Sequence, residues 1–298
     1  MKIGVMLPVG DNEGPEGGVP TWADIRAIAL AVESNGLDSV WLADHFLYRP
    51  GGDDPRTYGM HEAWTLLSAV AAVTERIELG TMVLCASFRD PGLTAKMAAA
   101  LDVVSSGRLI LGVGAGWHDP EYEAFGLPTD HRVGRFAEWL EIVVRLLRKE
   151  NFSFEGKYHQ VRDAEVVPAP EREIPILVAA RRPKMLELTA QWADAWNTAW
   201  FGAVDERVKE RLAELKVATD ASGRPEDAVA RTVGIVVRDP DQPAIDEPSA
   251  TAIDGTVEEL AAALRDYREL GVDHLIAAVE PVTPRSVERL AEAAKLLD

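Results

Sequence analysis

Residues 176–200, ILVAARRPKMLELTAQWADAWNTAW, contain the pattern that indicates the fold. Residues 176–179 form a continuous apolar run with the length of a β-strand. Pro183 then opens a segment with apolar side chains at three- and four-residue spacing, which predicts a helix over residues 183–192. A second strand-length run follows at residues 195–198. This order of strand, helix and strand is typical of a parallel βαβ unit.

The same order of a strand followed by a helix occurs eight times along the chain. Several of the strand-length runs are continuous in Val, Ile and Leu, as expected for parallel strands that helices cover on both faces. The strands are predicted at residues 2–7, 39–42, 77–84, 109–113, 176–179, 195–198, 232–237 and 273–279. The helices are predicted at residues 22–34, 62–73, 91–104, 134–150, 183–192, 204–219, 257–270 and 284–297.

Eight such units in 298 residues fit a closed (β/α)8 TIM barrel or a long doubly wound sheet. We favour the barrel, because the first strand-to-helix connection is a long acidic loop without a phosphate-binding fingerprint. A barrel enzyme carries its variable loops after the strands, and the long connections do lie there, at residues 8–20, 44–61, 114–133 and 238–255. Residues 152–161, FSFEGKYHQV, predict a small hairpin before the fifth strand. No linker or repeat divides the sequence, so we expect one domain over residues 1–298.

The composition narrows the class of protein. With 47% hydrophobic and 27% charged residues, the chain is expected to be soluble and globular. Its 31 basic and 49 acidic side chains give a net charge of -18, without the basic stripe of a nucleic-acid binder. No run of apolar residues is long enough for a membrane span, and the start lacks a secretory signal. We therefore expect a cytoplasmic protein without nucleic-acid or membrane partners.

The second predicted strand ends in VWLADHF, residues 40–46, where Asp44 and His45 enter the following loop. A histidine titrates near neutral pH, and a neighbouring carboxylate can orient it for proton transfer. The alternative is a polar pair that caps the loop. The carboxyl end of a barrel strand favours the catalytic interpretation.

The fourth predicted strand runs into GVGAGW, residues 112–117. Alternate glycines let the backbone approach a ligand closely and leave amide donors free, which makes Gly114, Ala115, Gly116 and Trp117 candidates for a pocket floor. A dinucleotide fingerprint is excluded, because its third glycine would fall on Trp117. In the next loop, Tyr122 and Phe125 are candidates for the wall of a pocket, with simple loop packing as the alternative.

Ala180, Arg181 and Arg182 precede the helix that Pro183 opens. Two cations beside the free amides of a helix N-terminus favour a phosphate site, and the alternative is a surface arginine pair. Trp196 and Trp200 flank the end of the sixth strand. The six histidines lack metal-ligand spacing, so no metal site is expected. Cys85, the one cysteine, is expected to pack rather than to act as a nucleophile.

The sequence resembles the luciferase-like monooxygenase superfamily of flavin and deazaflavin oxidoreductases. The resemblance rests on VWLADHF (40–46), ERIELGTMVL (75–84), DPGLTAKMAAALDVVSSGRLILGVGAGW (90–117), EYEAFGLP (121–128) and residues 176–200. It implies a TIM barrel with a tricyclic redox ring over its carboxyl-terminal mouth. VWLADHF together with GAGWHDPEYEAFG is most similar to members that use the deazaflavin coenzyme F420 rather than FMN.

The resemblance also assigns roles. Asp44 and His45 would stand near the ring, with His45 transferring a proton and Asp44 orienting it. Met82 and Val83 would be joined by a cis peptide in a bulge behind the ring, and Cys85 would line the same wall. Many relatives have glycines at the positions of Arg181 and Arg182, so these arginines would strengthen the phosphate site or obstruct it.

The expected function is F420-dependent hydride transfer to or from a small organic substrate. The substrate pocket is predicted to include Tyr122, Phe125, Trp196 and Trp200. One alternative is a monooxygenase that uses reduced FMN and oxygen. A second alternative is a barrel that binds flavin without catalysis. Relatives are often dimers, so a homodimer is also an expectation.

Overall fold

The computed structural model of the protein describes the chain except for residues 12, 15–16, 52–54, 226, 243–248 and 298. Parts of three long loops expected from the sequence, at residues 8–20, 44–61 and 238–255, therefore lie outside the described residues. Eight parallel strands close into a barrel, because pairing of β7 (Leu109–Gly114) with β10 (Ile176–Ala179) joins the two ends of the strand order. The predicted TIM barrel is confirmed.

The barrel strands match the predicted runs closely. They are β1 (Lys2–Met6), β2 (Ser39–Leu42), β5 (Glu78–Thr81) with β6 (Leu84–Cys85), β7 (Leu109–Gly114), β10 (Ile176–Ala179), β11 (Ala195–Phe201), β12 (Ala230–Arg238) and β13 (His274–Glu280). The third predicted strand differs, because it is interrupted between β5 and β6. Both pieces pair with β7, so the barrel wall continues across the interruption.

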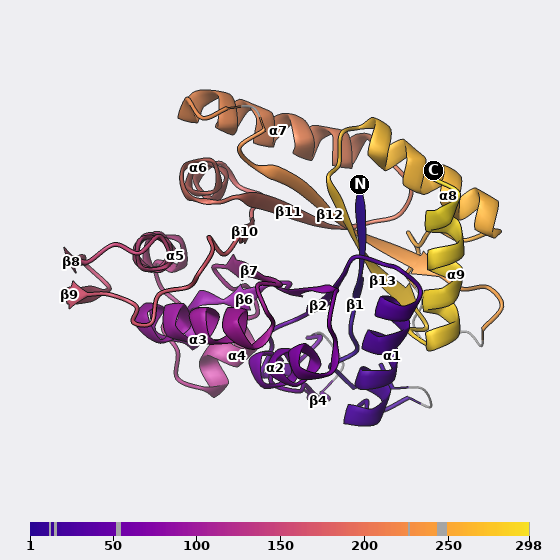
Figure 1. Ribbon diagram of the computed structural model, residues 1–298, viewed down its shortest axis with the longest axis horizontal. Helices are drawn as coiled ribbons and strands as arrows, with labels where there is room; N and C mark the ends of the chain where they lie inside the picture. Colours follow the sequence, from indigo (N-terminus) through magenta and orange to yellow (C-terminus); the bar gives the residue numbers. More distant parts are fainter. Residues whose placement is uncertain (12, 15–16, 52–54, 226, 243–248, 298) are drawn as a thin grey trace.

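Helices surround the barrel, and the last helix packs beside the first (Figure 1). The helices that follow the barrel strands are α1 (Trp22–Ser34), α2 (Ala63–Val73), α3 (Pro91–Val104), α5 (Arg132–Leu147), α6 (Pro183–Trp192), α7 (Glu206–Ser222), α8 (Val257–Glu269) and α9 (Pro284–Lys295). Local sequence explains several starts. Thr21 with Asp24 and Thr256 with Glu259 form capping boxes at α1 and α8.

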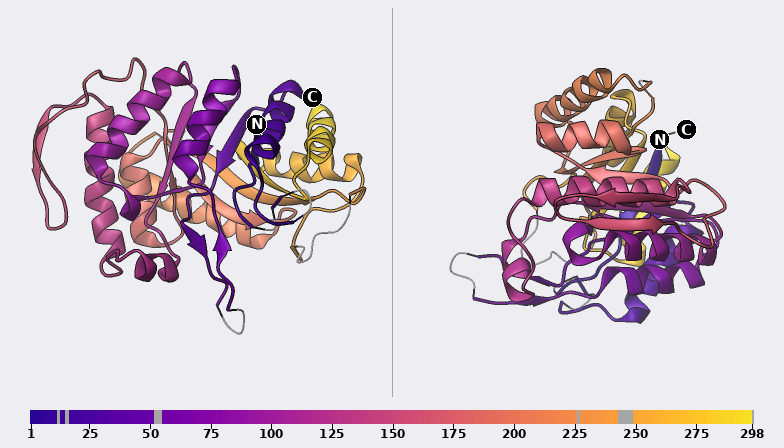
Figure 2. Two further views of the ribbon diagram at one scale, coloured as in Figure 1. Left: turned by 90° about the horizontal axis from the view of Figure 1, so that it is seen from below. Right: turned by 90° about the vertical axis from the view of Figure 1, so that its left-hand side faces the viewer.

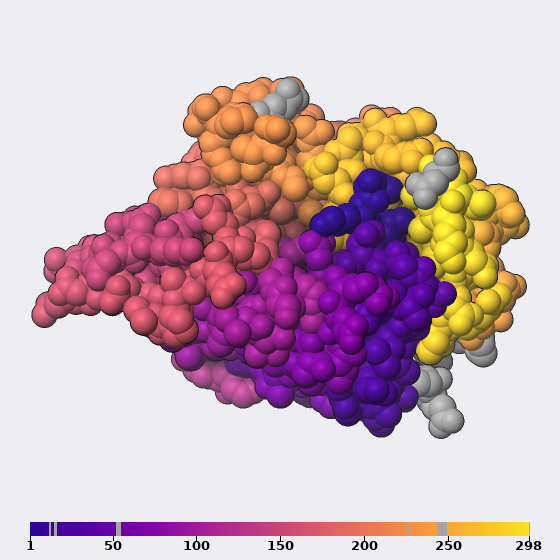
Figure 3. Space-filling model, in the orientation of Figure 1, coloured from indigo at the N-terminus to yellow at the C-terminus, as the bar shows by residue number. Residues whose placement is uncertain are grey.

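Short additional elements decorate the barrel. The loop after β2 contains a two-stranded hairpin of β3 (Leu47–Tyr48) and β4 (Tyr58–Gly59), and a 3-10 helix η1 (Ala86–Phe88) follows β6. A short helix α4 (Asp119–Ala124), which the sequence analysis left within a loop, follows β7. The predicted hairpin before the fifth barrel strand is present as β8 (Phe152–Glu155) and β9 (Gln160–Ala164) and projects from the molecule (Figures 2 and 3).

The core has an outer and an inner part. Strand residues such as Val40, Leu42 and Val178 pack between the barrel and the helices, whereas Trp41 and Leu177 belong to a separate cluster inside the barrel. This alternation follows from the two-residue period of a strand. Gly80 leaves space for the Trp41 ring, which a side chain at that position would overlap. The side chains around Trp41 therefore fill the interior of the barrel, and the remaining space lies at the carboxyl ends of the strands.

Candidate active site

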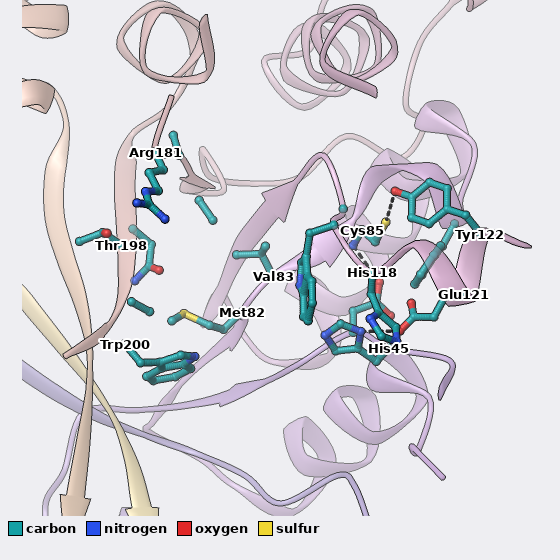
Figure 4. A pocket seen from close by; sticks show the side chains of 18 residues that line it. His45, Met82, Val83, Cys85, His118, Glu121, Tyr122, Arg181, Thr198 and Trp200 are labelled. Carbon is teal, nitrogen blue, oxygen red and sulfur yellow. Dashed lines mark hydrogen bonds and ion pairs between the residues drawn. The ribbon is translucent and has the colours of Figure 1, made fainter. Parts of the chain in front are cut away.

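A cavity of about 320 Å³ lies at the carboxyl ends of the barrel strands (Figure 4). Two groups of side chains face each other across it. Met82, Arg181, Thr198 and Trp200 lie on one side, and His45, Glu121 and Tyr122 lie on the other. The described residues that line it are Asp44, His45, Met82, Val83, Cys85, Phe88, Gly116, Trp117, His118, Glu121, Tyr122, Ala179, Ala180, Arg181, Asn197, Thr198, Ala199 and Trp200.

Most residues singled out in the sequence come together in this lining. The loop after β2 brings Asp44 and His45, the third barrel strand brings Met82, Val83 and Cys85, and the end of β10 brings Ala180 and Arg181. Tyr122 comes from α4 and Trp200 from β11. Gly116 and Trp117 come from the segment between β7 and α4.

Four predicted residues lie beside the cavity without lining it. Gly114 ends β7 and packs against Val83, and the Ala115 carbonyl accepts a hydrogen bond from the Tyr122 hydroxyl. Arg182 is exposed at the start of α6. Phe125 is exposed and packs against Phe46, with ring centroids 4.9 Å apart. For Phe125, the alternative of loop packing describes the structure better.

Trp196 is not part of the pocket. Its ring is fully buried in the core between the barrel and the helices, and its Nε1 donates a hydrogen bond of 2.8 Å to the Ala180 carbonyl. The preceding Ala195 faces the barrel interior, so strand alternation turns Trp196 outward. Trp196 thus supports the loop that carries Ala180 instead of contacting a ligand directly.

His45 and Glu121 form the shortest polar contact in the cavity. The Nδ1 atom of His45 lies 2.5 Å from Oε1 of Glu121, whose side chain is almost fully buried. We expected Asp44 to orient His45, and this expectation is wrong. The Asp44 carboxylate accepts its hydrogen bonds from Arg89 and from the Cys85 amide instead. The orienting carboxylate comes from α4, far along the chain.

Asp44 instead holds the loops together behind the cavity. Its carboxylate accepts two hydrogen bonds from Arg89, of 2.7 and 3.0 Å, and one of 2.9 Å from the Cys85 amide. Arg89 also donates a hydrogen bond of 2.5 Å to Glu62 at the start of α2. Burial would lower the pKa of the Arg89 guanidinium, but its hydrogen bonds and charge interactions with Asp44 and Glu62 raise it. Asp44 is therefore charge-compensated within the protein.

Cys85 and Tyr122 form a buried pair against the cavity wall. The Tyr122 hydroxyl donates to the Ala115 carbonyl at 3.0 Å, so the Cys85 thiol is the donor in the 3.3 Å contact between Sγ and that hydroxyl oxygen. Burial raises the pKa of the Cys85 thiol and the pKa of the Tyr122 phenol above their ordinary values. Both groups are neutral near pH 7, which agrees with the expected packing role of Cys85.

The peptide bond between Met82 and Val83 is cis, as the resemblance implied. It falls at the interruption between β5 and β6, where the side chains of Met82 and Val83 both reach the cavity. A second non-proline cis peptide joins Ala199 to Trp200 on the opposite wall. Two walls of the cavity are therefore shaped by local departures from regular strand geometry.

Arg181 reaches the cavity from the loop before α6. Neither Arg181 nor Arg182 has a hydrogen-bond or ion-pair partner among the described residues. Arg182 caps α6 without a side-chain hydrogen bond, so the first amides of this helix have no side-chain acceptor from the cap. A guanidinium without a partner beside free helix amides suits a phosphate group.

The sequence analysis did not assign Glu121, Phe88, His118, Thr198 or Ala199 to the site. Glu121 was visible only as one of several carboxylates after GAGW, and its contact with His45 spans 76 positions. His118 accepts a hydrogen bond from the Arg49 amide at 3.0 Å, and burial lowers the pKa of its imidazole. No local motif marks these residues. Their relation to the cavity depends on how the barrel closes.

The described residues lack two further features. They include no group of three or more His, Cys, Asp or Glu side chains arranged to hold a metal ion. Within the same part of the chain, no helix has both the length and the hydropathy that crossing a bilayer requires.

Curated relatives are oxidoreductases by name. An F420-dependent glucose-6-phosphate dehydrogenase from Amycolatopsis mediterranei is 31% identical over 236 residues, covering 77% of this chain and 68% of the relative. The enzyme of that name from Kineococcus radiotolerans is 33% identical, covering 76% and 66%. A pyrimidine monooxygenase RutA from Methylorubrum extorquens is 33% identical, covering 74% and 64%. The chain thus spans about two thirds of the length of these relatives.

Solved structures share the fold along the whole chain. An F420-dependent secondary alcohol dehydrogenase, solved with an F420-acetone adduct, superposes with a TM-score of 0.82 at 18% identity, covering 100% of this chain and 99% of that one. The monooxygenase RslO1 from Streptomyces bottropensis gives a TM-score of 0.77 at 25% identity, with the same coverage. The sequence profile of the luciferase-like monooxygenases matches residues 1–247. This chain therefore belongs to the luciferase-like monooxygenase family.

Proposed function

We propose that the protein is a coenzyme F420-dependent oxidoreductase that transfers a hydride to or from a small organic substrate. One observation carries the proposal. One cavity at the barrel mouth has Arg181, which has no partner among the described residues, on one wall, and His45, which contacts the Glu121 carboxylate, on the other. The first group suits a cofactor phosphate, and the second suits proton transfer beside a redox ring.

The residues present fit a phosphorylated redox cofactor. The cavity volume of about 320 Å³ is within the range of small-molecule sites, and no carboxylate of the described residues pairs with Arg181 and would compete with a phosphate. Ala180, Arg181 and the first amides of α6 would hold the phosphate. Met82 and Val83 would support one face of the ring, and Gly116 with Trp117 would close the pocket beside it.

When bound, the deazaflavin supplies the ring carbon that accepts or donates the hydride. The contribution of this chain is to position the reactants and to move the accompanying proton. The Glu121 carboxylate accepts the hydrogen of Nδ1, so Nε2 would be the His45 nitrogen that exchanges a proton with the substrate. Oxidation of an alcohol would release one proton to this atom, and reduction of a carbonyl would take one proton from it.

Glu121 would act as the positioning residue for His45. Its carboxylate fixes the tautomer of the imidazole and stabilises the positive charge that forms when Nε2 takes up a proton. Because Glu121 is almost fully buried, water does not compete strongly for this hydrogen bond. Asp44 would hold the neighbouring loops through Arg89 rather than touch the substrate.

The relatives support F420 as the first choice and FMN as the second. Both dehydrogenase relatives are named as F420-dependent. The similarity to pyrimidine monooxygenase RutA favours the alternative, an oxygen-using monooxygenase with reduced FMN. Deazaflavin lacks the ring nitrogen next to the oxygen-reactive carbon and reacts poorly with oxygen, so oxygen consumption separates the two alternatives.

The test incubates the protein with each reduced cofactor and a panel of organic acceptors, and records cofactor oxidation and oxygen consumption. Acceptor-dependent oxidation of reduced F420 without oxygen consumption is the expected result. Oxygen consumption with reduced FMN would support the monooxygenase. Tight binding without turnover of either cofactor would support the third alternative, a non-catalytic flavin-binding barrel. A cytoplasmic location and a homodimer remain predictions from the sequence.

A further inference from the structure

The lysines and arginines around the cavity limit the charge that a substrate can carry. Among the described residues, Arg181 is the one Lys or Arg side chain in the cavity lining. The residues that the structure does not describe are Asn, Asp, Glu, Gly, Pro, Ala and Ile. They therefore add no basic side chain to the barrel mouth.

Three other arginines at this end of the barrel already have acidic partners, whereas Arg49 donates to the Thr57 hydroxyl and Arg182 is exposed, and neither of these two lines the cavity. Arg89 is paired with Asp44 and Glu62. Arg132 is paired with Asp119. Arg238, the last residue of β12, is paired with Asp254 and Glu280. A second anion could recruit Arg89, Arg132 or Arg238 only by displacing a carboxylate that already contacts the arginine.

The wall opposite Arg181 is acidic. Glu121 is almost fully buried and its carboxylate contacts His45, so an anionic substrate group next to His45 would approach a buried carboxylate. Two neighbouring carboxylates repel each other, and the burial of Glu121 reduces the screening of this repulsion by water. An unpaired anion would also lose its hydration without gaining a cationic partner.

Aromatic and apolar side chains occupy much of the remaining wall. Trp117 and Trp200 are 64% and 42% exposed, which is unusual for such large rings. Phe88, Met82 and Val83 line the same space. Exposed aromatic rings around a concave site favour contact with an apolar or aromatic body, which would cover surface that is otherwise in water.

We infer that the substrate is an uncharged alcohol or carbonyl compound with an apolar or aromatic body, and not a phosphorylated sugar. The inference rests on the proposed function, because it assigns Arg181 to the cofactor phosphate. It separates this chain from the two dehydrogenase relatives, whose names specify glucose-6-phosphate. The hydroxyl or carbonyl oxygen would lie at Nε2 of His45, and the apolar body would lie against Trp117 and Trp200.

The test uses the protein loaded with F420. Its ligands are matched pairs that differ by one carboxylate: 1-phenylethanol with 4-(1-hydroxyethyl)benzoate, and three further pairs. Glucose-6-phosphate is tested as a separate ligand. Dissociation constants are measured from tryptophan fluorescence and by calorimetry. The neutral member of at least one pair should bind about 10-fold more tightly than its carboxylated partner, and glucose-6-phosphate should not compete with it.

Variants locate the binding surface. Trp200→Ala should weaken binding of the neutral ligand about 10-fold while leaving the affinity for F420 within about 2-fold, and Trp117→Ala should weaken binding of the neutral ligand by a similar factor. Trp22→Ala is the matched control, because Trp22 is 39% exposed on α1, outside the cavity, and its loss should change neither constant. Circular dichroism verifies that each variant is folded.

The outcomes separate the inference from the proposed function. Failure of the protein to bind F420 would overturn both. Normal F420 binding with equal or tighter binding of the carboxylated ligands or of glucose-6-phosphate would overturn the inference alone. Failure of every neutral ligand to bind the loaded protein would also overturn it.

Discussion

Glu121 of α4 places its Oε1 atom 2.5 Å from Nδ1 of His45, which follows β2, and so joins two loops of the barrel mouth. The carboxylate is almost fully buried, whereas the imidazole is about one-fifth exposed and lines the cavity. A buried carboxylate on one nitrogen leaves the other nitrogen available to a ligand. This arrangement makes Glu121 the residue on which the orientation of His45 depends.

Glu121→Gln is therefore expected to lower kcat about 100-fold with little change in F420 affinity, because the amide cannot stabilise the protonated imidazole as a carboxylate does. His45→Asn should lower kcat by at least as much, and the double variant should be no slower than His45→Asn alone. Steady-state kinetics and F420 titrations measure both constants. Glu123→Gln, an exposed neighbour on the same helix, is the control. Additive losses in the double variant would contradict a shared role.

Arg181→Ala should weaken F420 binding about 10-fold, because the F420 phosphate would lose its charge-assisted contact with the Arg181 guanidinium. Arg182→Ala should have a smaller effect, since this exposed side chain does not line the cavity. Fluorescence titration at low and high salt would measure both effects. Tighter binding by Arg181→Ala would show that the arginine obstructs the phosphate site.

Gly116→Ala should destabilise the protein by about 2 kcal/mol or more and disturb the cavity. The glycine has a φ of +75°, and a Cβ atom there would overlap the Tyr122 hydroxyl and crowd Cys85. Gly126→Ala is a matched control, because Gly126 also has a positive φ but has open space around it. The control should lose only about 1 kcal/mol, the backbone contribution. Equal losses in urea unfolding would argue against the steric role of Gly116.

The buried side chain of His274, the first residue of β13, should make the free energy of unfolding depend on pH. Its Nε2 lies 2.8 Å from the Ser39 hydroxyl, which also accepts from Trp41, and burial lowers the pKa of His274 to about 3. Between this value and the ordinary pKa of 6.5, the unfolded chain binds a proton that the folded protein does not. Stability should therefore fall by about 3 kcal/mol as the pH decreases from 7 to 4.

The measurement for His274 compares urea unfolding of the wild type and His274→Gln across this pH range. The variant lacks the titrating group, so its stability should change less with pH than that of the wild type. Parallel pH profiles would show that other groups cause the acid sensitivity.

Local sequence predicted the barrel because each βα unit carries its own signals, such as the Pro183 start of α6 and the apolar run of β10. The long loops were harder to predict. The helix α4 is short, and its contact between Glu121 and His45 depends on barrel closure, so no local pattern could assign it. The interruption at Met82–Val83 came from family resemblance and not from the residue pattern.

Trp196 shows an error that strand alternation could have avoided. Trp41 faces the barrel interior, and its neighbours Val40 and Leu42 face the helices. The same period applied to Ala195 places Trp196 on the outer face. The register between β11 and β12 shifts between Thr198 and Phe201, so regular alternation does not extend to Trp200, which lines the cavity. The single-domain assignment for residues 1–298 remains a prediction.

The central claim is that the cavity binds F420 in preference to FMN, with its phosphate at Arg181. The most direct test is parallel equilibrium titration of the purified protein and of Arg181→Ala with both cofactors. The account predicts tighter binding of F420 than of FMN, and about 10-fold weaker F420 binding by the variant. Tighter binding of FMN, or an F420 affinity that the substitution leaves unchanged, would contradict it.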